Sequence, residues 1–313
     1  MTDIGVMVPR DLAAERFIQY VRRAEELGFA EVWVVEDCFF RGGFTQAAVA
    51  LAVTERIRVG IGILPAVLRN PALTAMEAAT LAQLYPGRPV LGVGHGMPGW
   101  MRQVGAYPAS PLGALDEHLR TVRALLRGET VRDERLDAVT LDLPVPVVPP
   151  VLAGVRGPKS LALSGREADG TILAEPVTPE YLAAARGHIG ARAVAEGHRV
   201  VAYNVAAVDD DPQVARAAVR PALEWIGEPD WAPHITPLPF AAEFARLREE
   251  SADRAEFAAR LPGEWVDQLA VTGTPGQARE RIAALHAAGA GSVVLMPAGP
   301  DPLVALEGLG RVL

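Results

Sequence analysis

The stretch TERIRVGIGILPAVLRNPALTAMEAATLAQLYPGRPVLGVGHG, residues 54–96, decides the fold. It predicts a strand over 57–61, a helix over 71–84 and a second strand over 89–93, and each strand is followed by a glycine-containing loop. Two strands that are joined by a helix run parallel. Their carboxyl ends then lie at the same edge of the sheet, and the loops at that edge form a cradle for a bound cofactor.

The same alternation of strands and helices continues along most of the 313 residues. The other expected strands are 4–8, 31–35, 151–153, 170–173, 200–207 and 292–295. All are rich in Val, Ile, Leu and Ala, as strands buried on both faces should be. Eight such units in this length favour a closed (β/α)8 barrel over an open doubly wound sheet, and we expect residues 1–313 to form one domain.

The segment 209–265 interrupts this alternation between the seventh and eighth strands. It is expected to be helical, and it contains three of the five tryptophans, Trp225, Trp231 and Trp265. One interpretation is an outer helical layer with a small core of its own. The other is a lid over the barrel mouth or a dimer contact, because long insertions on the active face are often functional.

The composition argues against several classes of function. The formal net charge is −8 and no block of Lys or Arg occurs, so nucleic acid is not an expected partner. The single cysteine, Cys38, excludes an internal disulfide and a cysteine metal cluster, and it fits a reducing cytoplasm. No signal-peptide pattern, membrane-length apolar run, metal-ligand spacing or G-x-S-x-G motif is found, so neither a membrane, a metal nor hydrolase chemistry is expected.

The loop GVRGPKS, residues 154–160, is the strongest generic signal for a ligand. Gly154 and Gly157 free the backbone to approach a ligand, and Pro158 takes the favoured first position of a helix. Backbone N–H groups at a helix start suit a phosphate, and Arg156 adds positive charge. The alternative is an ordinary turn between a strand and a helix.

The pattern GVGHG, with Gly92, Gly94 and Gly96, is weak evidence for a dinucleotide fingerprint. Residues 97–99 stand where a helix should begin, and the acidic residues 116–117 fall inside an expected helix. We therefore reject a Rossmann fold. The glycines are expected to let a flat ring lie against the backbone.

Three titratable residues follow expected strands. Glu36 and Asp37 follow the second strand, where they serve as a base or as ring contacts, or else pair with Arg41 or cap the next helix. His95 follows the fourth strand, where it donates a hydrogen bond to a carbonyl group, acts as an acid, or is a structural residue of the rim.

Four segments, 24–37, 54–81, 157–173 and 271–300, resemble the luciferase-like oxidoreductase superfamily, whose members are flavin or deazaflavin enzymes on a (β/α)8 barrel. The segment 84–96 is similar to the branch that uses the deazaflavin coenzyme F420. The resemblance implies an enzyme that transfers a hydride between coenzyme F420 and a small organic substrate. The coenzyme supplies this chemistry, and the barrel positions and shields it.

The resemblance also implies the residues of the site. It implies a non-proline cis peptide bond between Gly62 and Ile63 behind the ring, and backbone contacts to the phosphate at Arg156 and Gly157. The residues expected to hold the coenzyme are Gly62, Ile63, Leu64, Gly94, Gly96, Gly154, Arg156, Gly157 and Pro158. Since dimers are common in the superfamily, a homodimer is expected.

Some positions depart from the branch. Its sugar-phosphate dehydrogenases carry Asp-His after the second strand and Glu in the fourth loop, where this chain has Glu36-Asp37 and Met97. Its reductases carry an acid on the first strand, and the strand IGVMVP has none. The substrate is therefore unassigned. Two alternatives stay open, an FMN-dependent monooxygenase that uses oxygen and a non-catalytic flavin-binding barrel.

Overall fold

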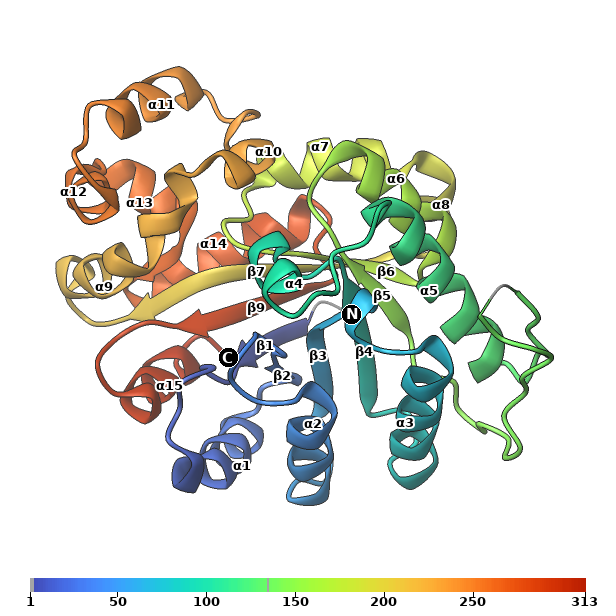
Figure 1. Ribbon diagram of the computed structural model, residues 1–313. Helices are drawn as coiled ribbons and strands as arrows, with labels where there is room; N and C mark the ends of the chain where they lie inside the picture. The colour runs from blue at the N-terminus through green and yellow to red at the C-terminus, as the bar shows by residue number, and fades with distance from the viewer. Residues whose placement is uncertain (1–2, 134) are drawn as a thin grey trace.

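The computed structural model describes residues 3–133 and 135–313, and Figure 1 shows a ring of strands surrounded by helices. Eight parallel strands pair in chain order, and the last pairs with the first, so that the sheet closes. They are β1 (Asp3–Met7), β2 (Glu31–Val34), β3 (Arg58–Pro65), β4 (Pro89–Gly94), β5 (Val151–Gly154), β6 (Gly170–Leu173), β7 (Arg199–Val208) and β9 (Ser292–Pro297). The expected (β/α)8 barrel is confirmed.

Helices cover the outside of this barrel. Their bounds are α1 (Phe17–Leu27), α2 (Gly43–Ala52), α3 (Pro71–Leu84), α4 (Pro98–Gln103), α5 (Pro111–Leu126), α6 (Pro158–Glu167), α7 (Pro179–Ile189), α8 (Ala191–Ala195), α14 (Pro275–Ala287) and α15 (Pro302–Gly310), with 3-10 turns η1 (Ala14–Arg16) and η2 (Ala66–Leu68). Asn70, Thr178 and Thr274 cap α3, α7 and α14 by accepting hydrogen bonds from N–H groups of the first turn. A proline follows each cap, so the sequence itself sets where each loop ends and its helix begins.

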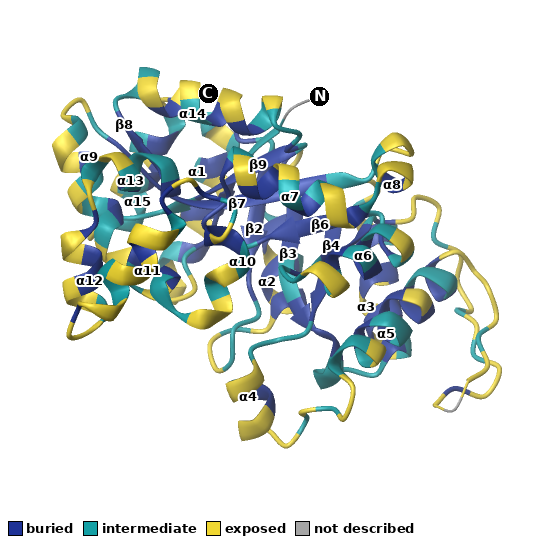
Figure 2. Cartoon of the chain, turned by 90° about the horizontal axis from the view of Figure 1, so that it is seen from above, coloured by how far each residue is buried: buried dark blue, intermediate teal, exposed yellow. Residues whose placement is uncertain are grey.

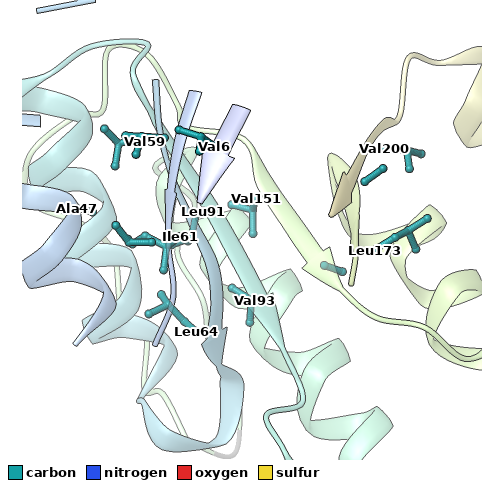
Figure 3. Close-up of a cluster of buried hydrophobic side chains, with 14 of the residues drawn as sticks. Val6, Ala47, Val59, Ile61, Leu64, Leu91, Val93, Val151, Leu173 and Val200 are labelled. Carbon is teal, nitrogen blue, oxygen red and sulfur yellow. The ribbon is translucent and has the colours of Figure 1, made fainter. Parts of the chain in front are cut away.

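The main hydrophobic core lies between the strands and the surrounding helices. Figure 3 shows Ile61 of β3 pointing toward Ala47 of α2, with Leu64 further along the same strand. Figure 2 shows the strands dark blue in the centre and yellow patches on the outer faces of the helices. Burial on both faces explains why the strand sequences are apolar throughout rather than alternating.

The floor of the barrel, at the amino ends of the strands, is charged. The carboxylate of Glu31 is almost completely buried, at 1% exposure. It is paired with Arg58 at 3.0 Å and with Arg199, and it accepts hydrogen bonds from Trp33 Nε1–H at 3.1 Å and the Ser292 hydroxyl at 2.7 Å. A fully paired charge closes the end of the barrel opposite the expected site.

The insertion forms a separate lobe. It comprises α9 (Pro212–Val219), η3 (Arg220–Gly227), η4 (Pro229–Trp231), α10 (Ala232–Ile235), α11 (Ala241–Glu249), α12 (Arg254–Arg260), α13 (Gly263–Leu269) and β8 (Val271–Gly273). Figure 1 shows α9 to α13 grouped beyond the end of β7. Phe244, Phe257 and Val266 belong to a hydrophobic cluster of this lobe, and Trp265 stacks on Phe240 at 4.7 Å between ring centroids. The first interpretation of the insertion, a helical layer with its own core, is confirmed.

Two short elements were not expected from the sequence. Strand β8 pairs with Ala206–Val208, the outer end of β7, and stands outside the barrel. The six-residue helix α4 begins at Pro98, directly after the loop in which we expected no helix to follow at once. In the ranges that the structure describes, no helix is both long and apolar enough to cross a bilayer.

Candidate functional site

The carboxyl ends of the strands surround the mouth of the barrel. Glu36, Ile63, Gly154, Glu175 and Met296 stay partly accessible there, although the strands leading to them are largely buried. These residues come from five different strand ends. Loops from around the whole barrel therefore meet at this mouth, as in other barrels of this type.

A bulge in β3 forms one wall of the mouth. The register between β3 and β4 shifts between Ile61 and Leu64, and the Gly62–Ile63 peptide bond is cis, as the resemblance implied. A Cβ at Gly62 would overlap the hydroxyl group of Tyr203 on β7. Only glycine fits at this position, whereas Leu64 is buried behind the wall.

The side chain of Ile63 fills the space beside the glycines of β4 and β5. A Cβ at Gly94 would lie 3.2 Å from Ile63 Cδ1, and one at Gly154 would overlap Ile63 Cγ2. Gly96 has a φ of 71°, which favours glycine, and its Cβ position is 2.9 Å from Met101 Sδ. We expected these glycines to admit a flat ring. In the structure, glycine at these positions also makes room for Ile63, for the Gly154 carbonyl oxygen and for Met101.

The amino end of α6 is open. Gly157 caps it without any side-chain hydrogen bond, and its backbone is extended, with φ −86° and ψ 156°. No atom lies within 4 Å of the position that a Cβ would take at Gly157. Pro158 occupies the first helical position, as expected. The N–H groups of the first turn lack partners inside the helix, so this end is suited to an anion such as a phosphate.

The side chain of Arg156 faces the insertion. Its guanidinium donates to the Asp230 carbonyl oxygen at 3.2 Å and lies over the Trp231 ring, 4.8 Å from the centroid. Its own carbonyl oxygen accepts from the Tyr181 hydroxyl at 3.1 Å. The loop before α6 is therefore held against the insertion, which supports the lid interpretation alongside the separate core.

Glu36 and Asp37 are already paired. Glu36 Oε2 accepts a hydrogen bond from the Gly43 N–H at 2.7 Å, which caps α2, and it pairs with Arg69 at 2.5 Å. Asp37 pairs with Arg10 at 2.9 Å. The possible cap is thus confirmed. The predicted alternative, an ion pair with Arg41, is wrong, because the Arg41 guanidinium donates to backbone carbonyl groups instead.

His95 lies near the open end of α6. Its Nε2 is 3.0 Å from the hydroxyl oxygen of Ser160, a residue of the first turn of that helix. Burial lowers the pKa of His95, so the ring is neutral at pH 7. The sequence singled out His95 but not Ser160, and the contact brings His95 to the anion-binding end.

Glu175, which follows β6, was not among the expected site residues. Burial raises the pKa of its carboxyl group above the usual value. It has no ion pair among residues 3–133 and 135–313, unlike Glu36 and Asp37. The signal in the sequence was its place, since it stands two residues after a buried strand of the barrel, where function gathers.

A family model described as "Luciferase-like monooxygenase" matches residues 1–292. The chain belongs to this family. As a member, it is a luciferase-like oxidoreductase, which sets aside the non-catalytic alternative. It is 27% identical to the 5,10-methylenetetrahydromethanopterin reductase of Archaeoglobus fulgidus, over 98% of this chain and 97% of that protein.

Solved structures show the same fold. The coenzyme F420-dependent tetrahydromethanopterin reductase of Methanopyrus kandleri superposes with a TM-score of 0.82 at 22% identity, covering 100% of this chain and 98% of that one. The oxygenating constituent of 3,6-diketocamphane monooxygenase from Pseudomonas putida, in complex with FMN, superposes with a TM-score of 0.74 at 17% identity, covering 99% and 96%. The fold is thus shared with a reductase described as coenzyme F420-dependent and with a monooxygenase solved in complex with FMN.

Proposed function

We propose that this protein is a coenzyme F420-dependent oxidoreductase that transfers a hydride between the deazaflavin and a small organic molecule. The observation that carries the proposal is the open end of α6 beside the accessible Gly62–Ile63 bulge. Both stand at carboxyl ends of the barrel, two strand spacings or about 10 Å apart. A ring with a short phosphate-bearing chain spans this separation.

The residues present fit such a coenzyme. The space around Gly157 is free of other atoms, and the first turn of α6 offers unpaired N–H groups and the Ser160 hydroxyl. Gly157, Pro158 and Ser160 would hold the phosphate, with the Arg156 backbone beside them. Ile63 would support the ring. When bound, the deazaflavin supplies the hydride chemistry.

The protein's own residues orient the reactants. The neutral His95 ring fixes the Ser160 hydroxyl at the phosphate end. Glu36 and Asp37 keep fixed negative charges beside the mouth, where we propose that they orient and polarise the substrate. The sequence identity of 27% to a methylenetetrahydromethanopterin reductase over nearly the whole chain supports a reductase role.

The second candidate is an FMN-dependent monooxygenase. It is favoured by the fold shared with a monooxygenase that was solved with FMN, since the open end of α6 suits the FMN phosphate equally well. Calorimetric titration with F420 and with FMN separates the two. Tighter binding of F420, together with turnover that does not need oxygen, is expected. Preference for FMN with strict oxygen dependence would overturn the first proposal in favour of the second.

A further inference from the structure

Glu175 stands two residues after β6, at the same end of the barrel as the Gly62–Ile63 bulge. Leu173 and Pro176 on either side are buried, yet Glu175 remains partly accessible itself. Loss of hydration is nevertheless the main cause of its raised pKa.

Three hydrogen bonds fix the backbone around this residue. The Glu175 carbonyl oxygen accepts from Trp231 Nε1–H at 3.0 Å, and the Pro176 carbonyl oxygen is 3.1 Å from His234 Nδ1. On the barrel side, the Val177 N–H donates to Asn204 Oδ1 at 3.0 Å. The insertion and β7 thus hold the segment from both sides, which fixes where the carboxyl group can reach.

The carboxyl group interacts with the backbone N–H of Glu175 itself. Within the described residues, no other residue donates a hydrogen bond to it. The charged groups that face it are Arg156 and Arg10, which favour its ionised form, and Asp37, which opposes it, while Tyr203 of β7 lies nearby on the barrel side. Burial outweighs the two arginines, so the pKa of Glu175 is raised. Of the three mouth carboxyl groups discussed, this one is free to exchange a proton with a bound molecule.

We propose that Glu175 is the proton donor for the reaction at this mouth. This inference rests on the proposed function, because it requires a two-electron hydride donor such as the reduced deazaflavin. The substrate class that follows is a molecule with a polar double bond, a ketone or an imine. Its oxygen or nitrogen atom faces Glu175.

The proposed step combines the addition of a hydride to carbon with the transfer of a proton from Glu175. A hydride, with its two electrons, adds to the carbon of the C=O or C=N group and forms a C–H bond. The π electron pair moves to the oxygen or nitrogen atom, which takes the proton of the Glu175 carboxyl group. Glu175 is left as a carboxylate and regains a proton from water. In the reverse direction the carboxylate accepts the proton of an alcohol or amine.

The first test reads the protonation state without coenzyme. Infrared difference spectra between the wild type and Glu175→Gln, recorded over a pH series, should show the Glu175 carboxyl group losing its proton at a higher pH than an exposed glutamate. The reference is Glu180→Gln, which removes an exposed glutamate five residues away. A Glu175 carboxyl group that ionises at the same pH as the exposed one, or at a lower pH, would overturn the proposal.

The second test measures turnover of reduced F420 with a panel of small ketones and cyclic imines. Glu175→Gln should lose about 100-fold or more in turnover, with an unchanged dissociation constant for F420. The decline in the rate of the wild type at high pH should be absent in the variant. A variant that retains turnover within about threefold would overturn the assignment.

Together the two tests distinguish a failure of the proposed function from a failure of the role assigned to Glu175. If the wild-type protein binds no F420, the proposed function fails, yet the infrared titration still decides whether Glu175 keeps its proton to a higher pH than an exposed glutamate. If F420 binds to both proteins and Glu175 ionises like an exposed glutamate, the coenzyme assignment stands and the role of Glu175 falls. Glu175→Asp keeps the acid on a shorter chain and should recover part of the lost turnover.

Discussion

The hydroxyl group of Tyr203 occupies the space that a Cβ at Gly62 would fill. Tyr203 is buried in the middle of the barrel, where its ring meets that of Trp33 edge-on at 5.7 Å between centroids. Its hydroxyl oxygen has no hydrogen-bond partner in the part of the chain that the structure describes. The wall of the mouth therefore rests directly on an aromatic side chain of the barrel interior.

This contact predicts a coupled pair of substitutions. Gly62→Ala should destabilise the protein by about 1–3 kcal/mol through overpacking. Tyr203→Phe removes a hydroxyl without a partner and should cost less than about 1 kcal/mol. Because the hydroxyl is the closest obstacle, the double variant should regain part of the loss. Guanidinium unfolding of the four proteins measures this coupling, and strictly additive effects would speak against the contact.

The charged floor predicts a strong effect far from the site. Glu31→Gln should destabilise the protein by about 1–3 kcal/mol, because the charged hydrogen bonds of Glu31 are lost and Arg58 and Arg199 are left to share Asp3. Glu196→Gln, which breaks an exposed pair with Arg192, should leave the unfolding midpoint unchanged. Equal midpoints for both variants would mean that the floor carries no special stability.

The open end of α6 predicts a clean binding variant. Gly157→Leu is compatible with the backbone, since its φ is −86° and no atom occupies the Cβ position. The side chain would extend into the space proposed for the phosphate, so the affinity for F420 should fall at least tenfold while the melting temperature stays the same. Gly187→Leu, at an equally open position in α7, is the control. Unchanged affinity would refute the phosphate site.

His118 predicts a pH dependence of stability. Burial, with Arg135 and Arg69 nearby, lowers the pKa of His118 to about 4. The unfolded chain takes up a proton on this histidine near pH 6.5, whereas the folded protein does not. The free energy of unfolding therefore decreases as the pH falls from 6.5 toward 4. His118→Leu should therefore gain stability relative to the wild type as the pH falls from 7 to 4. The control is His188→Gln, and a constant difference across this window would contradict the prediction.

The homodimer expected from the resemblance has a candidate surface. Leu73, Met76 and Leu84 lie along one side of α3 with 55%, 53% and 64% exposure. Exposed Glu77 and Thr80 lie on the same side, so a contact here would combine apolar and polar side chains. Met76→Glu should give a monomer in light scattering, whereas Val304→Glu, at an exposed apolar residue of α15, should not. A wild-type monomer would refute the expectation directly.

The sequence predicted the barrel well because its strands are buried on both faces and many of its helices, such as α3, α5 and α7, begin at prolines. The start of α6 at Pro158 followed from the same signals. The short elements β8 and α4 were not predicted, because three and six residues are too few to show a hydrophobic periodicity. These elements depend on tertiary packing, which overrides local propensity.

The contacts within the site were less predictable than its location. Gly94 and Gly154 were recognised as unusual, but their partner Ile63 lies on another strand. Glu36 pairs with Arg69 across 33 residues instead of with the nearby Arg41. Burial also distinguishes Glu175 from the paired carboxylates, and burial is a property of the folded chain.

Strand β7 has a further consequence for how this protein can change. Its ten residues contribute to three hydrophobic clusters, since Val200 and Ala202 belong to the main core, Val201 and Tyr203 to the barrel interior, and Val205 and Ala207 to the core of the lobe. The three clusters meet along this strand, while Trp231 and His234 bring the insertion to the segment that follows β6. We therefore expect substitutions inside the lobe to change access to the mouth without repacking the barrel.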